Sequence, residues 1–545
     1  MPESPLSRML SGSRWSRREW LGRGSLLTFL ASQFRGSAAA APAAAPVAPA
    51  GTGLRLGPQL YESIGVRPLV NARGTYTIIS GSTMLPEVRA AMAEASQHYV
   101  HLDELAEAIG ARLAELTKAE WGLVTSGCAA ALMHATAACV AGGNADLHVR
   151  MPDLRGFPRD EVIIPKHSRN VYDAAVRAVG VRVTEVATAA ELEAAFGPRT
   201  AMVYIYAGPN ADSGPLSTKA ICEIANKKGV PVLVDAAAEG LTVPNIHLQA
   251  GATLVGYSGG KCLRGPQSAG LLLGRKDLIH AAWVHSAPHH GYSRSTKVGK
   301  EEAMGMLMAV EMWVKRDHKA EWNQWLAWLD HVTKRVTAIP GVTTTVAQPE
   351  GLSNHTPTLN VQWDRDKVGL AGADASRLLL EGTPRVATLR EGGTEKGNLT
   401  GLTINPYMMA AGDEKIVADR LYAVLSSPPA PKAKEAVASP AADLTGQWDV
   451  RIDYAASKST HHLFLRQQGN RIEGSHQGDF VSRDLSGSID GAKVRLSSAY
   501  DERNGDALNF TFTGTVQGDG LSGTLEMGEY LGAKWTARRH TAAEA

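Results

Sequence analysis

The chain has 545 residues, 44% of them hydrophobic, and a formal net charge of +2. Such a composition is typical of a globular protein with several domains, and the small net charge excludes the basic excess of a nucleic-acid-binding protein. The cysteines form no CxxC pair and have no metal-ligand spacing, so the sequence predicts neither a disulfide framework nor a metal site; they are Cys128, Cys139, Cys222 and Cys262.

Residues 1–50 have the pattern of a targeting segment. Arg17 and Arg18 precede a short apolar run at 26–31 and a small-residue tract at 37–41. This order resembles a bacterial twin-arginine (Tat) export signal, cleaved near residues 38–45, and the alternative is an Ala/Pro tail with a chance arginine pair. We expect export through the Tat machinery to the periplasm or another extracytoplasmic space, without a stable membrane span.

From about residue 54 to 425, helical and strand patterns alternate. The expected elements are helices at 87–96 and 102–117, a strand at 121–125, a helix from 126 to about 141, a strand at 161–165, a helix at 171–179, a strand at 201–206, a helix at 217–228, strands at 231–235, 254–257 and 270–273, and helices at 301–315 and 320–338. Near-continuous apolar strands between helices indicate a mostly parallel sheet, an α/β fold. Ligands of such sheets bind beyond the carboxyl ends of the strands.

Two groups of residues follow that rule. Ser126, Gly127 and Cys128 lie where a strand meets a helix N-terminus, and free N–H groups there would hold a phosphate, unless the turn is a simple cap. Asp235 ends an apolar strand, where its carboxylate could pair with a pyridinium nitrogen or could be an ordinary loop carboxylate.

Lys261 completes the pattern. It follows Ser258, Gly259 and Gly260, 26 residues after Asp235. Glycines at a strand end let a ligand approach the amine closely, whereas a surface lysine in a glycine-rich turn is the common alternative. With a strand-end aspartate and a phosphate loop in the same chain, we predict a Schiff base between Lys261 and pyridoxal 5'-phosphate.

Four motifs carry a specific resemblance. They are Asp235-Ala236-Ala237-Ala238-Glu239, Ser258-Gly259-Gly260-Lys261, Gly265-Pro266-Gln267 and the run at 297–302. Together they resemble the selenocysteine synthase (seryl-tRNA selenium transferase) superfamily, nearest its D-glucosaminate-6-phosphate ammonia lyase-like branch, over residues 54–425. The resemblance implies a fold-type-I, aminotransferase-like PLP-dependent fold, with a large subdomain at about 71–290 and a small α+β subdomain from 54–70 and 300–425.

The resemblance also implies roles for single residues. Lys261 would be the Schiff-base lysine, Asp235 the pyridinium partner, and Ser258 would bind the phosphate with the loop at 126–129. His167 could stack on the cofactor or cap the next helix, and Asn210 could bond the ring oxygen or form a plain turn.

Three arginines are candidates for substrate binding. Arg264 could touch phosphate, substrate or only the surface, and Arg385 falls where related enzymes place a carboxylate-binding arginine. Arg294 belongs to a basic group with Lys297 and Lys300 that could reach an anionic substrate or begin a solvated helix. Three tryptophans recur every three residues, which favours packing over a binding surface; they are Trp322, Trp325 and Trp328.

The end of the chain differs in pattern. Residues 426–442 are rich in Pro, Ala and Lys and predict an extended linker. Residues 443–541 alternate apolar and polar residues between Gly/Asn/Asp turns, which predicts an antiparallel β module of seven or eight strands, a barrel or a sandwich. His461 and His462 are adjacent and so point to opposite faces, which makes them a poor metal pair. A binding or stabilising role is expected.

The expected function is that of a PLP-dependent lyase, which removes a β-substituent from an amino acid or amino-sugar acid and releases ammonia. The alternatives are a PLP-dependent transferase, such as a selenium transferase or an aminotransferase, and a non-catalytic binding protein on the same fold. Selenium transfer is less favoured because an exported enzyme would not meet aminoacyl-tRNA, and no nucleic-acid partner is expected. Sites of this fold usually lie at a subunit interface, so we expect at least a homodimer.

Overall fold

The structure is a computed structural model that describes residues 53–389, 397–429, 436–498 and 509–541. The chain divides into two compact units, Met1–Pro68 and Leu69–Ala545. In the first unit, residues 53–68 are described and contain the 3-10 helix η1 (Glu62–Ile64). The segment expected to be a Tat signal lies outside the described residues, and the domain boundaries stay predictions.

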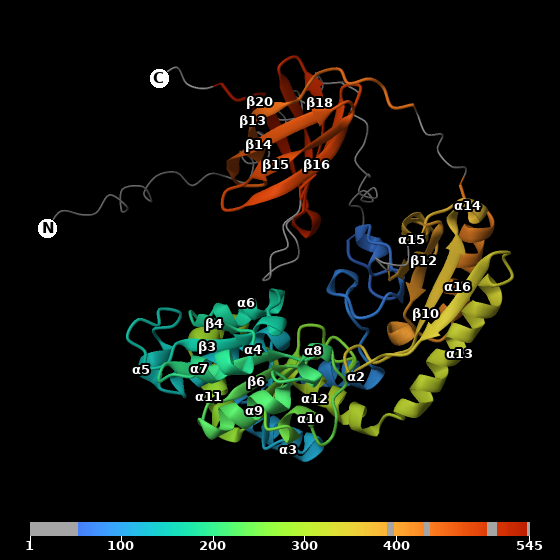
Figure 1. The fold of residues 1–545 in the computed structure, drawn as a ribbon. Helices are drawn as coiled ribbons and strands as arrows, with labels where there is room; N and C mark the ends of the chain where they lie inside the picture. The colour runs from blue at the N-terminus through green and yellow to red at the C-terminus, as the bar shows by residue number, and fades with distance from the viewer. Residues whose placement is uncertain (1–52, 390–396, 430–435, 499–508, 542–545) are drawn as a thin grey trace, which may run out of the picture. The chain divides into compact units, whose positions relative to one another are not determined.

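A seven-stranded sheet forms the centre of the large subdomain (Figure 1). Its spatial order is β2 (Trp121–Thr125), β8 (Gly270–Gly274), β7 (Leu254–Ser258), β6 (Val232–Asp235), β5 (Thr200–Tyr206), β3 (Glu161–Pro165) and β4 (Arg182–Val186). The pairs from β7 through β4 are parallel, and β8 is antiparallel to both of its neighbours. The predicted mostly parallel α/β sheet is therefore confirmed.

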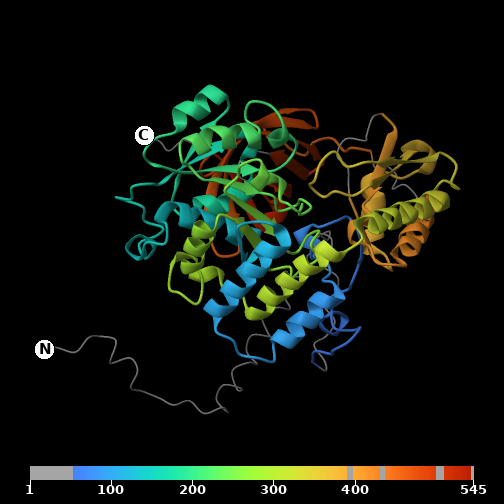
Figure 2. The same cartoon turned by 90° about the horizontal axis from the view of Figure 1, so that it is seen from below.

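Helices cover both faces of this sheet. They are α2 (Pro86–Ala95), α3 (Leu102–Thr117), α4 (Gly127–Ala141), α5 (Ala145–His148), α6 (Ala174–Arg177), α7 (Ala189–Ala195), α8 (Pro209–Asp212), α9 (Thr218–Lys227), α10 (Ile246–Gln249), α11 (Lys276–Val284) and α12 (Lys300–Lys315). Four 3-10 helices join them: η2 (Thr77–Ile79), η3 (Lys166–Ser168), η4 (Val171–Asp173) and η5 (Tyr292–Thr296). Figure 2 shows α12 beside α2 and α3, against which it packs.

Strand alternation sends neighbouring side chains to opposite cores, because successive residues of a strand point to opposite faces. In β6, Val232 and Val234 join the core that contains α3, α9 and α12. Leu233 joins the core on the other face, with α4 and α11. Asp235 follows Leu233 by two residues and therefore lies on the α4 face, at the carboxyl end of the strand.

Several described elements, among them β4, α7 and α11, were not predicted from the sequence, and one predicted helix is shorter in the structure. The strand β4 gives a weak signal because it is an edge strand with one exposed and three half-buried residues. The helix expected at 171–179 is instead the 3-10 helix η4 followed by the four-residue α6. A capping box at Asn170 begins this segment, and Gly180, at φ +96°, turns the chain soon after it ends.

The small subdomain is an α+β layer, as predicted. Its antiparallel sheet has the order β12 (Leu399–Ile404), β10 (Thr358–Asp364) and β9 (Val342–Ala347), and a separate parallel pair joins β1 (Val70–Ala72) to β11 (Val386–Thr388). The helices are α13 (His318–Val336), α14 (Arg365–Val368), α15 (Gly372–Glu381) and α16 (Asp413–Ser426), with the 3-10 helix η6 (Pro406–Met408). One core built around Trp363 contains residues of both the helices and the sheets.

The C-terminal module is a closed antiparallel barrel of eight strands, which decides between the barrel and the sandwich. The strands are β13 (Gly446–Asp453), β14 (Lys458–Gln468), β15 (Arg471–Gln477), β16 (Ser482–Asp490), β17 (Lys493–Ser498), β18 (Phe510–Gln517), β19 (Gly520–Glu526) and β20 (Gly532–Arg539), with the 3-10 helix η7 (Gly528–Tyr530) before the last. Trp448, Phe512 and Trp535 fill its interior. His461 points inward to His476 and His462 outward to Asp449, as their adjacency predicted.

None of the described helices is both long and apolar enough to cross a membrane. Across the described ranges, no cluster of three or more His, Cys, Asp or Glu side chains could hold a metal ion. All four cysteines are buried free thiols.

A buried histidine in the large subdomain should make folding sensitive to acid. Both ring nitrogens of His285, after α11, are buried without a hydrogen-bond partner, and burial lowers the pKa of His285 from 6.5 to about 4. The folded state disfavours the charged imidazolium. The contribution of His285 to the free energy of unfolding is therefore present above pH 6.5 and is lost as pH falls toward 4. The loss is about 3 kcal/mol.

The variant His285→Phe should remove that part of the pH dependence. We expect the difference in unfolding free energy between variant and wild type to grow in favour of the variant from pH 7 to pH 4, measured by urea unfolding. His280→Phe, on the exposed face of the same helix, is the matched control. Parallel curves for wild type and His285→Phe would contradict the assignment.

Candidate active site

Lys261 lies in a tight turn that follows β7. A Cβ on Gly259 would come within 2.8 Å of the Ala269 carbonyl oxygen, and one on Gly260 within 2.9 Å of Gln267 Cα. Only glycine therefore fits the two positions before Lys261. The lysine is half-buried, and within the described residues its side chain makes no hydrogen bond or ion pair. Its amine is available to a ligand.

Asp235 is almost wholly buried at the end of β6, with 1% of its surface exposed. Its Oδ1 accepts hydrogen bonds from the Ala237 backbone N–H at 3.1 Å and from Cys128 Sγ at 3.6 Å. Its Oδ2 accepts one from the Tyr204 hydroxyl at 3.0 Å. These donors come from the loop after β6, from α4 and from β5, so three elements fix the carboxylate.

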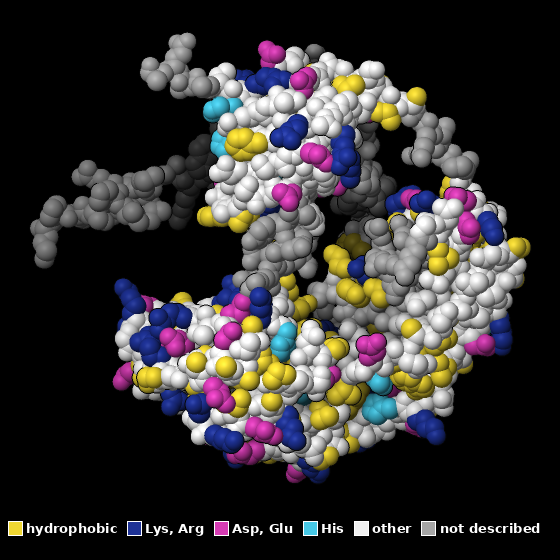
Figure 3. Space-filling view, in the orientation of Figure 1, with side chains coloured by type: hydrophobic (Ala, Val, Ile, Leu, Met, Phe, Trp, Pro, Cys, Tyr) yellow, Lys and Arg dark blue, Asp and Glu magenta, His cyan; other side chains and the backbone are white. Residues whose placement is uncertain are grey.

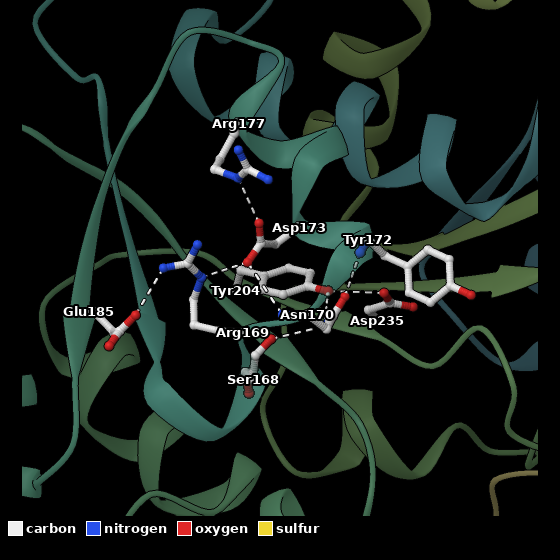
Figure 4. A network of polar contacts seen from close by, with 9 residues as sticks. All are labelled: Ser168, Arg169, Asn170, Tyr172, Asp173, Arg177, Glu185, Tyr204 and Asp235. Atoms are coloured by element: carbon white, nitrogen blue, oxygen red, sulfur yellow. Dashed lines mark hydrogen bonds and ion pairs between the residues drawn. The ribbon is translucent and has the colours of Figure 1, made fainter. Parts of the chain in front are cut away.

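A polar network continues from Asp235 to the surface (Figure 4). Asn170 Nδ2 donates to the Tyr204 hydroxyl at 3.4 Å and to the Ser168 carbonyl at 2.9 Å. Beyond it, the buried Asp173 pairs with Arg169 Nε at 2.6 Å and with Arg177 Nε at 2.7 Å. Neither Tyr204 nor Asn170 was predicted from the sequence. Strand alternation was a signal for Tyr204, but only the pairing of β5 with β6 brings it to Asp235.

The carboxylate of Asp235 is under electrostatic strain. Burial raises its pKa, and the Ala237 N–H, the Tyr204 hydroxyl and the charge of Lys261 oppose that shift only in part. The hydrogen-bonding partners are neutral, and a buried carboxylate without a bonded cation is costly. A cationic N–H group bound against Asp235 would remove this cost.

The loop before α4 has the form of an anion cradle. Ser126 is the N-cap residue of α4, but its side chain makes no capping hydrogen bond. Gly127 has φ +81°, and a Cβ built there would meet nothing within 4 Å, so the space beside it is open. Cys128 is the second residue of the helix, and its Sγ bonds Asp235. A phosphate at this helix N-terminus would accept hydrogen bonds from free backbone N–H groups. One of these groups belongs to Cys128, whose side chain contacts Asp235.

His167 and Asn210 lie on neighbouring short elements, η3 and α8, which pack against each other. His167 Nε2 is buried and has no hydrogen-bond partner, and burial lowers the pKa of His167. The Asn210 side chain is exposed. A neutral imidazole with an unsatisfied nitrogen suits a ring packed against a ligand better than a helix cap, so the stacking role stays the preferred prediction.

The remaining predicted residues lie on several elements. Ser258 ends β7, and its backbone N–H donates to the Ala237 carbonyl at 3.4 Å, beside the Asp235 loop. Arg264 Nε donates to the Thr83 carbonyl at 3.0 Å. Arg385 Nε donates to the Leu380 carbonyl at 2.8 Å in the small subdomain, and Arg294 is exposed on η5.

These residues fit pyridoxal phosphate. The buried carboxylate of Asp235 matches a protonated pyridine nitrogen, the open N-terminus of α4 matches the phosphate, and Lys261 offers an amine without a protein partner among the described residues. The unsatisfied nitrogen of His167 lies on the η3 segment next to α8. The roles of Lys261 and Asp235 are proposals, and the variants described below test them.

Removing the Tyr204 hydroxyl should weaken cofactor binding without disturbing the fold. In Tyr204→Phe, Asp235 loses its hydroxyl donor, which raises its pKa further and weakens its pairing with a cation. We expect cofactor affinity to fall about ten- to a hundredfold, measured by absorbance titration of the apoprotein. The control is Tyr257→Phe, a buried tyrosine whose hydroxyl bonds Asn245 instead. Equal losses in both variants would refute the role of the network.

Comparisons with known proteins agree with this geometry. The family model Aminotransferase class-V matches residues 163–298. D-glucosaminate-6-phosphate ammonia lyase of Salmonella typhimurium is 29% identical over 375 residues, which cover 67% of this chain and 97% of that protein. A solved structure of D-glucosaminate-6-phosphate ammonia-lyase superposes with a TM-score of 0.61 at 28% identity, over 68% of this chain and 99% of the other.

Two further relatives differ in their chemistry. The 5'-C-glycyluridine monooxygenase-decarboxylase of a Streptomyces species is 31% identical over 379 residues, covering 67% of this chain and 92% of that protein. L-seryl-tRNA(Sec) selenium transferase of Moorella thermoacetica is 28% identical over 40% of this chain and 51% of the relative. The chain is thus a pyridoxal-phosphate-dependent enzyme, and it belongs to the fold-type-I selenocysteine synthase superfamily, in the branch that resembles D-glucosaminate-6-phosphate ammonia lyase.

Proposed function

We propose that this enzyme is a lyase that acts on an amino acid or amino-sugar acid by α,β-elimination and releases ammonia. The observation that carries the proposal is the buried carboxylate of Asp235, at the carboxyl end of the central strands. Burial raises the pKa of Asp235, and the nearby charge of Lys261 lowers it. A relative named as an ammonia lyase, similar over two-thirds of this chain, supports the choice of elimination.

The chain supplies a base and a fixed anion for such a reaction. Pyridoxal phosphate, when bound, supplies the electron sink that makes a substrate α-proton removable. Asp235 keeps a negative charge against that sink, held by Tyr204, Cys128 and the Ala237 N–H. Lys261 Nζ takes the α-proton as general base. The β-substituent leaves with its electron pair, and hydrolysis of the resulting enamine gives a keto acid and ammonia.

The proposal is tested with the cofactor-saturated enzyme and a panel of candidate substrates. The panel contains β-hydroxy amino acids, their phosphorylated forms and 2-amino-2-deoxy sugar acids, and both ammonia and keto acid are measured. Equal amounts of the two products, formed with and without oxygen, are expected. Turnover that requires a second keto acid would indicate an aminotransferase, and turnover that requires oxygen would indicate the chemistry named in the Streptomyces relative.

Selenium transfer to tRNA has less support. The net charge is +2, and acidic and basic side chains are interspersed over the visible face of the large subdomain (Figure 3). Phosphate-backbone binding depends on a concentrated basic surface. We therefore propose a small-molecule substrate.

We further propose a homodimer and export through the Tat pathway. The dimer rests on analogy with other fold-type-I enzymes, and light scattering of the purified enzyme tests it. Export rests on the order of the arginine pair, apolar run and small-residue tract in residues 1–50. Replacing Arg17 and Arg18 with lysine should retain the protein in the cytoplasm of a bacterial host, and unchanged export would refute the Tat route.

A further inference from the structure

Two adjoining cavities lie beside the turn that carries Lys261. The first, of about 290 Å³, has Cys262, Arg264 and Arg316 in its lining. The second, of about 390 Å³, has Trp313 and Trp322 in its lining. Four lining residues are common to both, so the cavities adjoin: Arg316, Glu321, Trp325 and Tyr407. The first cavity reaches the main chain next to Lys261, since Cys262 follows that lysine.

The charges around the first cavity are unbalanced. Arg316 is neutralised by Glu321, with Nε–Oε1 at 2.9 Å and Nη2–Oε2 at 3.1 Å. Arg264 has no such partner: throughout the described ranges it forms no ion pair, and its guanidinium donates only to the carbonyl and hydroxyl oxygens of Thr83, at 3.0 and 3.2 Å. Burial, and then the charge of Arg316, lower the pKa of Arg264. The cavity therefore presents one uncompensated guanidinium.

The backbone holds Arg264 in a conformation that few residues adopt. Its φ is +54°, in the left-handed region that favours glycine. Its N–H donates to the Lys261 carbonyl at 3.0 Å, and its carbonyl accepts from the Leu85 N–H at 3.2 Å. These two bonds fix the direction of the side chain relative to the lysine turn.

Aromatic rings form the wall of the second cavity. Trp322 and Trp325 meet edge to face with centroids 6.2 Å apart, and Trp325 packs on Tyr407 at 5.3 Å. The tryptophan stripe was predicted to serve packing, and Trp328 does pack against the core of the small subdomain. Trp322 and Trp325 also line the cavity. Trp325 lines the first cavity as well, so an aromatic ring borders the cavity that holds Arg264. This arrangement favours a ring that carries an anionic group.

We propose that the joined cavities bind a small ring-bearing oxyanion, with its phosphate or carboxylate on Arg264 and its ring against Trp322 and Trp325. The binding does not depend on the elimination reaction. The anion has two possible sources, the far end of a substrate or a separate effector, and both use the same chemistry. In either case the ligand lies next to the main chain of the Lys261 turn.

Calorimetric titration of the wild-type enzyme, saturated with pyridoxal phosphate, tests the proposal directly. The probes are phenyl phosphate, benzoate, inorganic phosphate and phenol. Phenyl phosphate and benzoate should bind at least about tenfold more tightly than phenol, and phenyl phosphate more tightly than inorganic phosphate. If phenyl phosphate binds no better than phenol, the proposal is wrong.

Variants assign the two halves of the ligand. Arg264→Gln should weaken the binding of phenyl phosphate and of inorganic phosphate about ten- to a hundredfold. Trp322→Ala should weaken the binding of phenyl phosphate and leave the binding of inorganic phosphate unchanged. Arg377→Gln, on the exposed surface of α15, is the charge control and should change neither. The absorbance of the bound cofactor should be the same in all three. If Arg264→Gln does not fold, Arg264→Lys replaces it and should show a smaller loss.

The source of the anion follows from inhibition kinetics on any substrate found by the product assay. Competitive inhibition by phenyl phosphate would mean that the site holds the anionic end of the substrate. Non-competitive inhibition or activation would identify an effector site. Because binding is measured without turnover, a failed elimination assay leaves this result unaffected, and unchanged phosphate affinity in folded Arg264→Gln would overturn the proposal.

Discussion

Replacing Lys261 with alanine is expected to abolish turnover and the covalent attachment of pyridoxal phosphate. The lysine supplies both the amine that bonds the cofactor and the base that takes the α-proton, and Gly259 and Gly260 leave no neighbouring side chain to replace it. Loss of a catalytic base alone costs about 10²–10⁴-fold, so a decrease of at least about 10³-fold in kcat is expected.

The covalent bond gives a readout that does not depend on the substrate. Borohydride reduction of the wild type should fix the cofactor to one peptide that contains Lys261, detected by mass spectrometry, and the alanine variant should give no labelled peptide. Lys334→Ala, an exposed lysine on α13 paired with Asp330, should behave as wild type. Labelling of another lysine in the Lys261 variant would show that the assignment is wrong, and absence of cofactor from both proteins would favour the non-catalytic alternative.

Strong local signals explain which elements were predictable. The strands at 121–125 and 161–165 agree with the structure to the residue, because each is a short apolar run beside a turn or a helix start. The helix at 102–117 also agrees, since Leu105, Ile109 and Leu113 lie on one face. The weaker patterns failed where tertiary contacts decide, as in the edge strand β4, whose residues are mostly half-buried. The antiparallel direction of β8 has no local signal at all.

The candidate site shows the same division. Asp235 and Lys261 were predictable because each follows a buried strand whose end must face the ligand. Their supporting residues were not. Tyr204 reaches Asp235 only through the pairing of β5 with β6, and Asn170 reaches Tyr204 only through the position of the η3–η4 segment. Arg316 and Glu321 are only five residues apart, where α12 ends and α13 begins, but their position beside Arg264 likewise depends on the whole fold. Sequence patterns indicate strand ends, whereas the surroundings of a strand end depend on the whole fold.

Replacing Asp235 with asparagine should impair function and yet stabilise the protein without its cofactor. Asparagine keeps the shape and can still accept from Tyr204, but it has no charge to pair with a pyridinium. We expect cofactor affinity to fall about ten- to a hundredfold and kcat by at least about 10²-fold, because a charge-assisted hydrogen bond at the electron sink is lost.

The stability change follows from the raised pKa of Asp235. A carboxyl group whose pKa is higher in the folded state stabilises the fold below its unfolded pKa, near 3.8, and loses that contribution as pH rises through the folded pKa. At pH 7 the ionised group is therefore a cost, which Asp235→Asn removes. The apoprotein variant should unfold at a higher temperature than wild-type apoprotein at pH 7, and the difference should shrink as pH falls toward 4.

Asp173 is the matched control for this argument. It is also fully buried, but Arg169 and Arg177 pair with it at 2.6 and 2.7 Å. Asp173→Asn removes the carboxylate that Arg169 and Arg177 share, although Arg169 keeps its pair with Glu185 at 2.9 Å. The substitution should destabilise the protein by up to about 3–5 kcal/mol. Opposite signs for the two substitutions would identify Asp235 as a charge kept for a ligand and Asp173 as a charge kept for the fold, whereas destabilisation by both would mean that Asp235 is structural.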